Sequence, residues 1–235
     1  MKIKITKDGP YIVTGNIPLY NEIIACDEEG NTTGFKEKEK IDSSETYTLC
    51  RCGESENKPF CDGSHLKINF DGTEVVSKKI YEESLTTFET DKIRLDDAIE
   101  LCDHSRFCQK NEGIRKLIEK GDPESIKIAK EQASNCPSGR LLILDKESGG
   151  ESTEKEYEKE IVILYDQGKD CEGPIWVKGK IPIESEDGDF YENRNRITLC
   201  RCGKSKHKPF CDGKHWMSPE MEYKFRKKWN LKDLD

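Results

Sequence analysis

The stretch CRCGESENKPFCDGSH occupies residues 50–65 and places three cysteines and one histidine within sixteen positions. Residues 200–215, CRCGKSKHKPFCDGKH, repeat it. Over residues 49–65 and 199–215 the two copies match at thirteen of seventeen positions without a gap. An internal repeat of this kind indicates a duplicated structural unit. The sequence therefore predicts two copies of one binding loop, one near each end of the chain.

The duplication extends upstream of both loops. GPYIVTGNIPLYNE at 9–22 aligns with GPIWVKGKIPIESE at 173–186. The β-branched and aromatic residues favour extended structure, and the glycines favour turns or bulges. We therefore expect each copy to form a strand, a Gly-Pro turn, a second strand and then the cysteine loop. The first copy also carries a polar insertion at 27–44, DEEGNTTGFKEKEKIDSS, which we expect to be a mobile loop.

The composition favours small modules held together by something other than a large core. Of 235 residues, 33% are hydrophobic and 37% are charged, and eleven are cysteines. No apolar run is long enough for a signal peptide or a membrane span, so we expect a cytoplasmic protein without a membrane partner. In a reducing cytoplasm the cysteines are expected to bind metal rather than form disulfides. The net charge of −8 argues against nucleic acid as a partner.

A segment of different character lies between the two copies. TFETDKIRL (87–95) reads as one strand, PESIKIAKEQAS (123–134) as a helix with Pro123 in its first turn, and GRLLILDKE (139–147) as a closing strand. The charged, glycine-bearing stretch that follows is typical of a linker. The tail at 221–235 has helical potential, and we interpret its basic side chains as a solvated face.

These patterns predict an α+β chain in which two small β-rich modules flank a central α+β module. The expected boundaries are 1–80 for the N-terminal module, 81–147 for the central module, 148–158 for the linker and 159–235 for the C-terminal module. We use these module names, and call residues 50–65 the N-terminal loop and residues 200–215 the C-terminal loop.

Each loop offers the same set of candidate ligands, with the same spacing. They are Cys50, Cys52, Cys61 and His65 in the first copy, and Cys200, Cys202, Cys211 and His215 in the second. The spacing indicates two pairs, Cys50 with Cys52 and Cys61 with His65, and a two-iron cluster needs one pair for each iron. The i, i+4 separation of Cys61 and His65 fits one face of a helical turn, which Asp62 can cap. Three thiolates and one imidazole also suit a structural zinc ion, which is the alternative.

Both loops resemble the CDGSH iron–sulfur (mitoNEET-like) proteins. The motif C-x-C-x2-S-x3-P-x-C-D-G-x-H is present twice, and the second copy departs from the family name only in having Lys214 in place of serine. The resemblance implies a [2Fe–2S] cluster held by three cysteines and one histidine in each copy, below a β-rich cap. Since single-motif members are homodimers, we expect the two copies to pack as an intramolecular pseudo-dimer in a monomeric chain.

A third group of cysteines lies in the central module. LCDHSRFCQ (101–109) and NCPSGRLLI (135–143) contain Cys102, Cys108 and Cys136. With C-x-H-x3-C and CPSG, the segment resembles a divergent single-cluster ferredoxin. Three cysteines suffice for a [3Fe–4S] cluster, and a [4Fe–4S] cluster would need a fourth ligand from His104, Ser105 or solvent. The alternatives are a domain that has lost its cluster and a zinc site that includes His104.

A few residues of the loops and cap fall outside these sets. Arg51 and Arg201, each between two cysteines, either donate hydrogen bonds to a cluster or face solvent. We expect Cys26 and Cys171 to be ordinary free cysteines and His207 to be a surface residue.

No catalytic triad, phosphate loop, dinucleotide fingerprint or paired-carboxylate motif is present, so we do not expect an enzyme. The motifs favour an electron carrier that serves redox partner proteins. The first alternative is a cluster donor to apo iron–sulfur acceptor proteins, or a redox or iron sensor, because a histidine ligand makes a cluster labile near neutral pH. The second alternative is a scaffold for protein interactions in which zinc ions hold the cysteine loops together.

The charges around the two loops predict different reduction potentials. Residues 49–65 carry a formal charge of −1 and residues 199–215 a charge of +4. Because positive surroundings stabilise the reduced and more negative cluster, the C-terminal site should have the higher potential. A redox titration checks this, with each site removed in turn. A single unresolved wave, or the reverse order, would contradict it.

Overall fold

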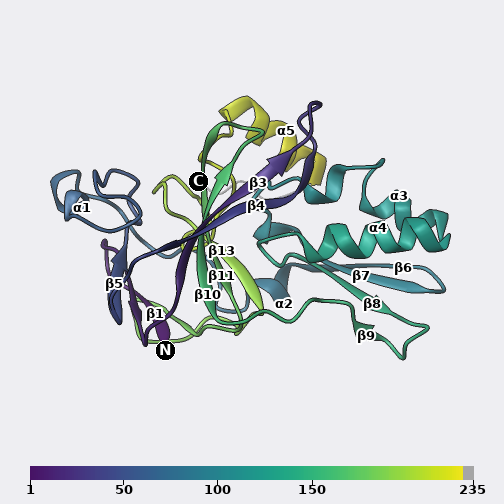
Figure 1. The fold of residues 1–235 in the computed structure, drawn as a ribbon, viewed down its shortest axis with the longest axis horizontal. Coiled ribbons are helices and arrows are strands. Elements are labelled where there is room, and N and C mark those ends of the chain that lie inside the picture. Colours follow the sequence, from purple (N-terminus) through teal and green to yellow (C-terminus); the bar gives the residue numbers. More distant parts are fainter. Residues whose placement is uncertain (230–235) are drawn as a thin grey trace.

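A computed structural model describes residues 1–229 of the chain, and the part of the predicted helical tail at 230–235 lies outside the described residues (Figure 1). The fold is mixed α+β and rich in strands, as expected. The tail is helical as far as it is described, in α5 (Pro219–Trp229). In the described part of the chain every helix is too short or too polar to traverse a lipid bilayer.

The strands of the two terminal modules form two sheets. The four-stranded sheet contains, in order across it, β12 (Ile183–Glu184), β1 (Lys2–Ile5), β2 (Tyr11–Thr14) and β5 (Thr46–Leu49). The five-stranded sheet contains β13 (Arg196–Leu199), β11 (Cys171–Lys178), β10 (Glu160–Asp166), β3 (Leu19–Cys26) and β4 (Thr32–Ile41). Each sheet therefore contains strands from both ends of the sequence.

The two terminal modules exchange strands in an approximately symmetric way. Strand β1 pairs in parallel with β12, and β10 pairs in parallel with β3. The backbone N–H of Ile3 donates to the carbonyl of Pro182, and that of Ile161 donates to the carbonyl of Pro18, both at 2.9 Å. Pro18 and Pro182 occupy matching positions of the repeat. The same hydrogen bond is thus made once in each direction between the two copies.

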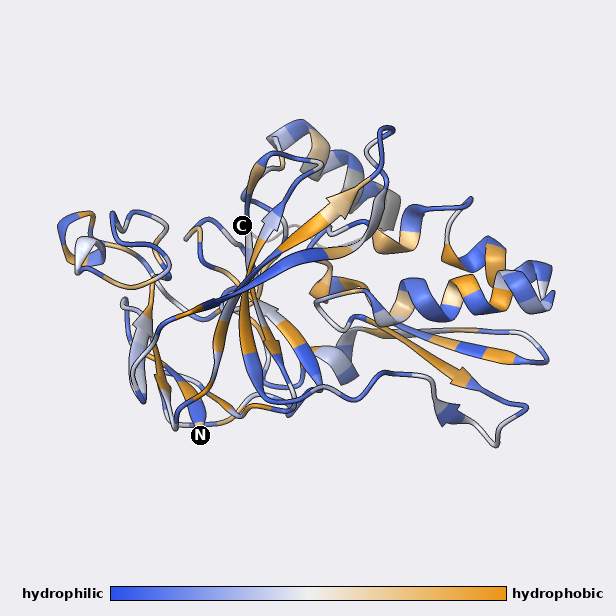
Figure 2. Cartoon of the chain, viewed as in Figure 1, coloured by the Kyte–Doolittle hydropathy of each residue, from blue (hydrophilic) through white to orange (hydrophobic). Residues whose placement is uncertain are grey.

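One hydrophobic core is shared by both terminal modules. It combines β1 and β2 residues such as Ile3 and Val13 with β10 and β11 residues such as Ile161 and Ile175, all fully buried. Figure 2 shows the apolar residues concentrated along these central strands. Because a 235-residue chain with 33% hydrophobic residues has little apolar surface to bury, pooling it in one core stabilises modules that are small individually.

The central module has its own antiparallel sheet and core. The sheet order is β6 (Leu85–Glu89), β7 (Ile93–Ala98), β8 (Leu141–Asp145) and β9 (Glu151–Ser152). Helices α3 (Ile114–Lys120) and α4 (Pro123–Ser134) pack over it (Figure 1). The helix predicted at 123–134 is confirmed residue for residue. Its start is fixed by Asp122, whose carboxylate accepts a hydrogen bond from the Ser125 amide at 3.0 Å.

Three local predictions were wrong. The stretch 87–95 is a hairpin of β6 and β7 rather than one strand. A turn joins the two strands, because the Thr90 amide donates to the Ile93 carbonyl and the Thr90 hydroxyl accepts from the Ile93 amide. The polar insertion at 27–44 is largely strand β4, which pairs with β3 along most of its length. The second Gly-Pro pair lies inside β11 instead of in a turn.

Two of these errors have a tertiary cause. Strand β4 has mainly charged side chains, but Phe35 stacks on Trp176 at 4.7 Å between ring centroids and anchors it to the five-stranded sheet. In β11, a register shift in its pairing with β10 accommodates the Gly-Pro pair within the strand.

Short helical elements complete the chain. They are α1 (Ser64–Lys67), α2 (Ile80–Ser84), and two 3-10 helices at Ile99–Leu101 and Phe107–Gln109. The central module is tied to β13 by Arg196, which is 1% exposed. Its guanidinium donates to the carbonyls of Cys136 at 2.7 Å and Ala133 at 2.9 Å.

The substitution Tyr11→Phe tests the contact between the β-cap and the C-terminal loop. The Tyr11 hydroxyl is fully buried and donates to the carbonyl of Cys200 at 2.8 Å. Its loss should lower the free energy of unfolding by about 1–3 kcal/mol, because a buried carbonyl loses its partner. Urea unfolding followed by circular dichroism measures this. Tyr165→Phe, at an exposed position of β10, is the control and should change it by less than about 0.5 kcal/mol. Equal effects would contradict the prediction.

Candidate functional site

The candidate ligands of the N-terminal loop lie in two close pairs. The Sγ atoms of Cys50 and Cys52 are 3.7 Å apart. The Sγ atom of Cys61 is 3.4 Å from Nδ1 of His65. The pairing is the one that the spacing predicts.

The C-terminal loop repeats this geometry. Its Cys200 and Cys202 Sγ atoms are 3.8 Å apart, and the Cys211 Sγ atom is 3.6 Å from Nδ1 of His215. The expected helical turn is only partly present. Helix α1 begins at Ser64, after Cys61, and residues 214–216 form a turn. The loop backbone itself, more than a helix face, brings each cysteine beside its histidine.

The same backbone hydrogen bonds shape both loops. The N–H of Cys50 donates to the carbonyl of Pro59, and that of Cys200 to the carbonyl of Pro209, both at 2.8 Å. One oxygen of Asp62 accepts from the Ser64 amide and the other from the Glu56 amide, each at 2.9 Å. These bonds hold the pKa of the Asp62 carboxyl well below its usual range. The capping role that the sequence predicts for this aspartate is confirmed.

The two loops touch each other. Cys52 and Cys202 form an isolated antiparallel bridge. The following residues, Gly53 and Gly203, leave no room for a side chain, because an added Cβ would lie 2.7 Å from the carbonyl oxygen of Cys202 and 2.5 Å from that of Cys52, respectively. The conserved length and the glycines of both loops allow this close backbone approach.

The two loops differ in burial at Cys61 and Cys211. Cys211 is 3% exposed and the matching Cys61 is half-buried, whereas in the first pair Cys52 is buried and the matching Cys202 is half-buried. Burial raises the pKa of the Cys211 thiol and lowers the pKa of His215 to about 4. A neutral imidazole is the form that binds a metal ion. The buried thiols, in contrast, must lose their protons when a metal binds.

Of the two alternatives for the loop arginines, the structure contradicts exposure to solvent, and the expectation for His207 was wrong. Arg51 is 2% exposed, and its guanidinium donates to the carbonyls of Thr6, at 3.1 Å, and Gly72. Arg201 donates to the carbonyl of Gly173 at 2.8 Å. Neither faces solvent, because each ties its loop to neighbouring backbone. His207 is 5% exposed and not a surface residue, since the central module covers it.

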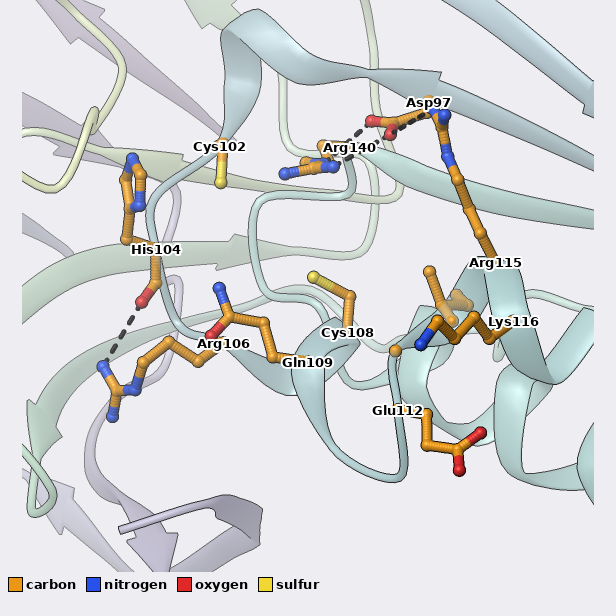
Figure 3. Close-up of a pocket in the computed structure, with 12 residues that line it drawn as sticks. Asp97, Cys102, His104, Arg106, Cys108, Gln109, Glu112, Arg115, Lys116 and Arg140 are labelled. Carbon is orange, nitrogen blue, oxygen red and sulfur yellow. Dashed lines mark hydrogen bonds and ion pairs between the residues drawn. The ribbon is translucent and has the colours of Figure 1, made fainter. Parts of the chain in front are cut away.

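The central module contains an open cavity of about 460 Å³ beside two of its cysteines (Figure 3). The Cys102 and Cys108 thiols point into it, next to Arg140 (Figure 3). Cys136 is buried nearby, with its Sγ atom 3.5 Å from the hydroxyl of Ser138. Burial raises the pKa of all three thiols, that of Cys108 to about 12. The three cysteines and Arg140 are near enough to influence one another electrostatically: Cys102 and Cys136 contribute to raising the pKa of Cys108, and Arg140 lowers it.

Arg140 is the principal cation of this cavity. It is 5% exposed and donates from Nε and Nη2 to the two carboxylate oxygens of Asp97, both at 2.8 Å. Arg115 approaches the same carboxylate at 3.6 Å from the cavity rim. A buried guanidinium close to three thiols favours their thiolate forms and a negatively charged occupant.

His104 lies in the cavity wall, but its imidazole is directed toward the C-terminal loop. An added Cβ on Gly213 would be only 2.6 Å from its Cδ2 atom. Its ring also meets the Trp216 ring edge-on at 6.0 Å between centroids. Burial lowers the pKa of His104 to about 4.

Family comparisons match three segments of this architecture. The family of iron-binding zinc fingers of CDGSH type matches residues 8–66 and 172–216. The family described as divergent 4Fe-4S mono-cluster matches residues 88–146. The chain thus carries two CDGSH domains in tandem, one on each side of a divergent 4Fe-4S mono-cluster domain. No curated protein and no solved structure matches it significantly.

This tandem CDGSH protein is therefore an iron–sulfur protein with its cluster domains at 8–66, 88–146 and 172–216. Within residues 1–229, no three His, Cys, Asp or Glu side chains are grouped closely enough for a single metal ion. The close groups in the CDGSH loops are pairs. None of the cysteines within residues 1–229 forms a disulfide, Cys26 and Cys171 included.

The residues that the sequence did not reveal are Asp97 and Arg140, which line the central cavity. Asp97 and Arg140 lie on or next to β7 and β8, which pair directly, so only the register brings them together. A buried arginine has no local sequence signature. The one available signal is the position of Arg140 four residues after Cys136, within the CPSGR stretch.

Arg140→Met tests the ion pair of the cavity. It leaves the Asp97 carboxylate buried without its bidentate partner, which should lower the free energy of unfolding by about 3–5 kcal/mol. Arg115→Met is the matched control, since it contacts the same carboxylate from a half-exposed position, and should cost less than about 1 kcal/mol. Urea unfolding of both variants provides the measurement. Similar losses would show that the pair has no special role.

Proposed function

We propose that this protein is an electron carrier with two [2Fe–2S] clusters and a third, cysteine-bound cluster. Each terminal cluster would be held by the three cysteines and one histidine of a CDGSH loop. The third would be held by Cys102, Cys108 and Cys136. A bound iron–sulfur cluster supplies reversible one-electron chemistry.

The arrangement of the donors in pairs carries this proposal. Two donors on one tetrahedral metal ion at bond lengths of 2.0–2.3 Å are separated by about 3.3–3.8 Å. The Cys–Cys and Cys–His distances of both loops, 3.4–3.8 Å, fall in this range. A single zinc ion would require all four donors at such separations. Two pairs without a closer grouping suit two metal ions joined by bridging atoms.

The surroundings of the loops also suit a negatively charged group. The Nε atom of Arg51 is buried and has no hydrogen-bond partner among the described residues. Arg51 stands between Cys50 and Cys52, so this N–H is available to a sulfide or a thiolate. Arg201 interacts electrostatically with Cys50 of the opposite loop as well as with Cys202. Such donors stabilise thiolates in a buried site.

The terminal modules are proposed to act as an intramolecular pseudo-dimer. The reciprocal hydrogen bonds from Ile3 and Ile161, and the bridge between Cys52 and Cys202, support an approximate two-fold relation. The two loops are therefore neighbours, and the central cavity adjoins the second of them through His104. Three adjacent one-electron sites in one monomeric chain suit transfer between redox partner proteins.

For the central site, both a [3Fe–4S] and a [4Fe–4S] cluster are compatible with the proposal. The three thiols are sufficient for a [3Fe–4S] cluster, and a [4Fe–4S] cluster requires one further ligand. The ring of His104 is directed toward Gly213 and Ser105 does not line the cavity, so solvent in the open cavity is the best-placed candidate.

A second function, cluster donation, is favoured by one observation. Cys61 and His65 are only half-buried, so an acceptor protein has access to this side of the N-terminal loop. Mixing the loaded protein with an apo-ferredoxin separates the two functions. A carrier keeps its iron, and a donor loses it to the ferredoxin.

Metal and sulfide analysis of anaerobically purified protein tests the proposal. Two [2Fe–2S] clusters contribute about four irons and four sulfides per chain, and the central site adds three or four irons. Cys61→Ser and Cys211→Ser should each lower the iron content by about two atoms. Cys26→Ser, outside all three sites, is the control and should leave it unchanged. A colourless protein with zinc in place of iron would contradict the proposal.

A further inference from the structure

We propose that residues 100–106 of the central module form a built-in cover over the C-terminal CDGSH site, whereas the N-terminal site is open to chelators and to partner proteins. The two sites would then differ in function although their loops are nearly identical. This inference rests on the proposed function, in that both loops hold clusters.

The cover contacts the half of the C-terminal loop that carries Cys211 and His215. The His104 ring lies directly on Gly213, where an added Cβ would be 2.6 Å from Cδ2 and 3.1 Å from both Cβ and Cγ of the histidine. The same ring meets Trp216, the residue after His215. His104 thus covers the backbone between the two candidate ligands.

A second contact lies at the other side of the same loop. Nδ1 of His207 is 3.1 Å from the carbonyl oxygen of Glu100 and 3.4 Å from its Oε2 atom. His207 is buried by this contact, and the matching residue of the first copy, Asn57, is exposed. The cover therefore contacts the loop at two points, one before Cys211 and one after it.

The cover is held in place by contacts with the five-stranded sheet. Arg106 forms a bidentate ion pair with Asp166 at the end of β10, with both distances at 2.8 Å. The Thr32 hydroxyl donates to the carbonyl of Ser105 at 2.9 Å. His104 and Arg106 adopt positive φ angles of 61° and 66°, which persist only where surrounding contacts impose them. These constraints indicate a fixed cover rather than a mobile flap.

The N-terminal loop lacks an equivalent within the described part of the chain. At Gly63, which matches Gly213, an added Cβ would meet no atom within 4 Å. Leu66, which matches Trp216, is 74% exposed. Figure 1 shows why: helix α1, which carries His65, lies at one end of the molecule, and the helices of the central module lie at the other.

Exposure of the ligands decides how fast a metal site exchanges. A chelator must reach the metal or its ligands, so a covered site releases iron only when the cover opens, and that opening costs free energy. The loops share thirteen of seventeen residues and the same internal hydrogen bonds, so apart from their charge the cover is the main difference between them.

Iron release from two single-site proteins tests the inference. Cys61→Ser keeps only the C-terminal site intact, and Cys211→Ser keeps only the N-terminal site. Iron release to an anaerobic ferrous chelator is followed by absorbance, and the electron paramagnetic resonance signal of the reduced terminal cluster is followed in parallel. The central site contributes equally to both iron curves. We expect release from the N-terminal site to be about tenfold faster.

Variants of the two matched glycines distinguish the effect of the cover on iron release from the effect of the loop itself. Gly213→Ala, in the Cys61→Ser protein, should displace His104 and raise the release rate toward that of the N-terminal site. Gly63→Ala, in the Cys211→Ser protein, is the control: its φ of 87° is close to the 79° of Gly213, but it meets no neighbour. The backbone strain is the same in both, and only the contact differs.

A second, less disruptive substitution tests the cover even if Gly213→Ala misfolds. His207→Asn gives the C-terminal loop the residue that the N-terminal loop has at the same position, and should also accelerate release. Equal rates in the two single-site proteins, or a rate that neither Gly213→Ala nor His207→Asn alters, would overturn the cover. Absence of iron from both proteins would instead refute the proposed function.

Discussion

The parallel pairing between strands of opposite ends of the chain is the constraint on which the rest of the structure depends. The hydrogen bonds from Ile3 to Pro182 and from Ile161 to Pro18 place a strand of each terminal module in the sheet of the other. Neither module can then close its core alone. The exchange also fixes the position of the loops, which meet at Cys52 and Cys202.

The central module breaks the symmetry that this exchange creates. It is inserted between the repeats and contacts both of them, but it covers only the C-terminal loop, through His207 and Gly213. Its own core, with Leu95 and Ile118, is separate from the shared one. A duplicated chain with equal sites has in this way become one with an inner and an outer site.

Burial and charge act in opposite directions at the inner site, because burial alone penalises added negative charge and positive side chains stabilise it. The C-terminal loop has the more positive sequence, and its Cys211 is more deeply buried than the matching Cys61, and both properties change the free energy of a charged group held there. Positive side chains stabilise added negative charge, and a low-dielectric environment strengthens that interaction. In the central cavity, the carboxylate of Asp97 holds the guanidinium of Arg140 beside Cys102 and Cys108.

The sequence by itself determined the duplication, the candidate ligands of each loop and their pairing by spacing, and the segment of the central cysteines. It also determined helix α4, whose limits follow from the Asp122 cap and Pro123 at its first turn. These features depend on residues close in the chain, where spacing and capping preferences act directly. Only the tertiary structure decided that the insertion at 27–44 is a strand, that Arg51 and His207 are buried, and that His104 faces the C-terminal loop. Each of these outcomes depends on a partner that lies tens to more than a hundred residues away, and local patterns contain no information about which distant surface a side chain will meet.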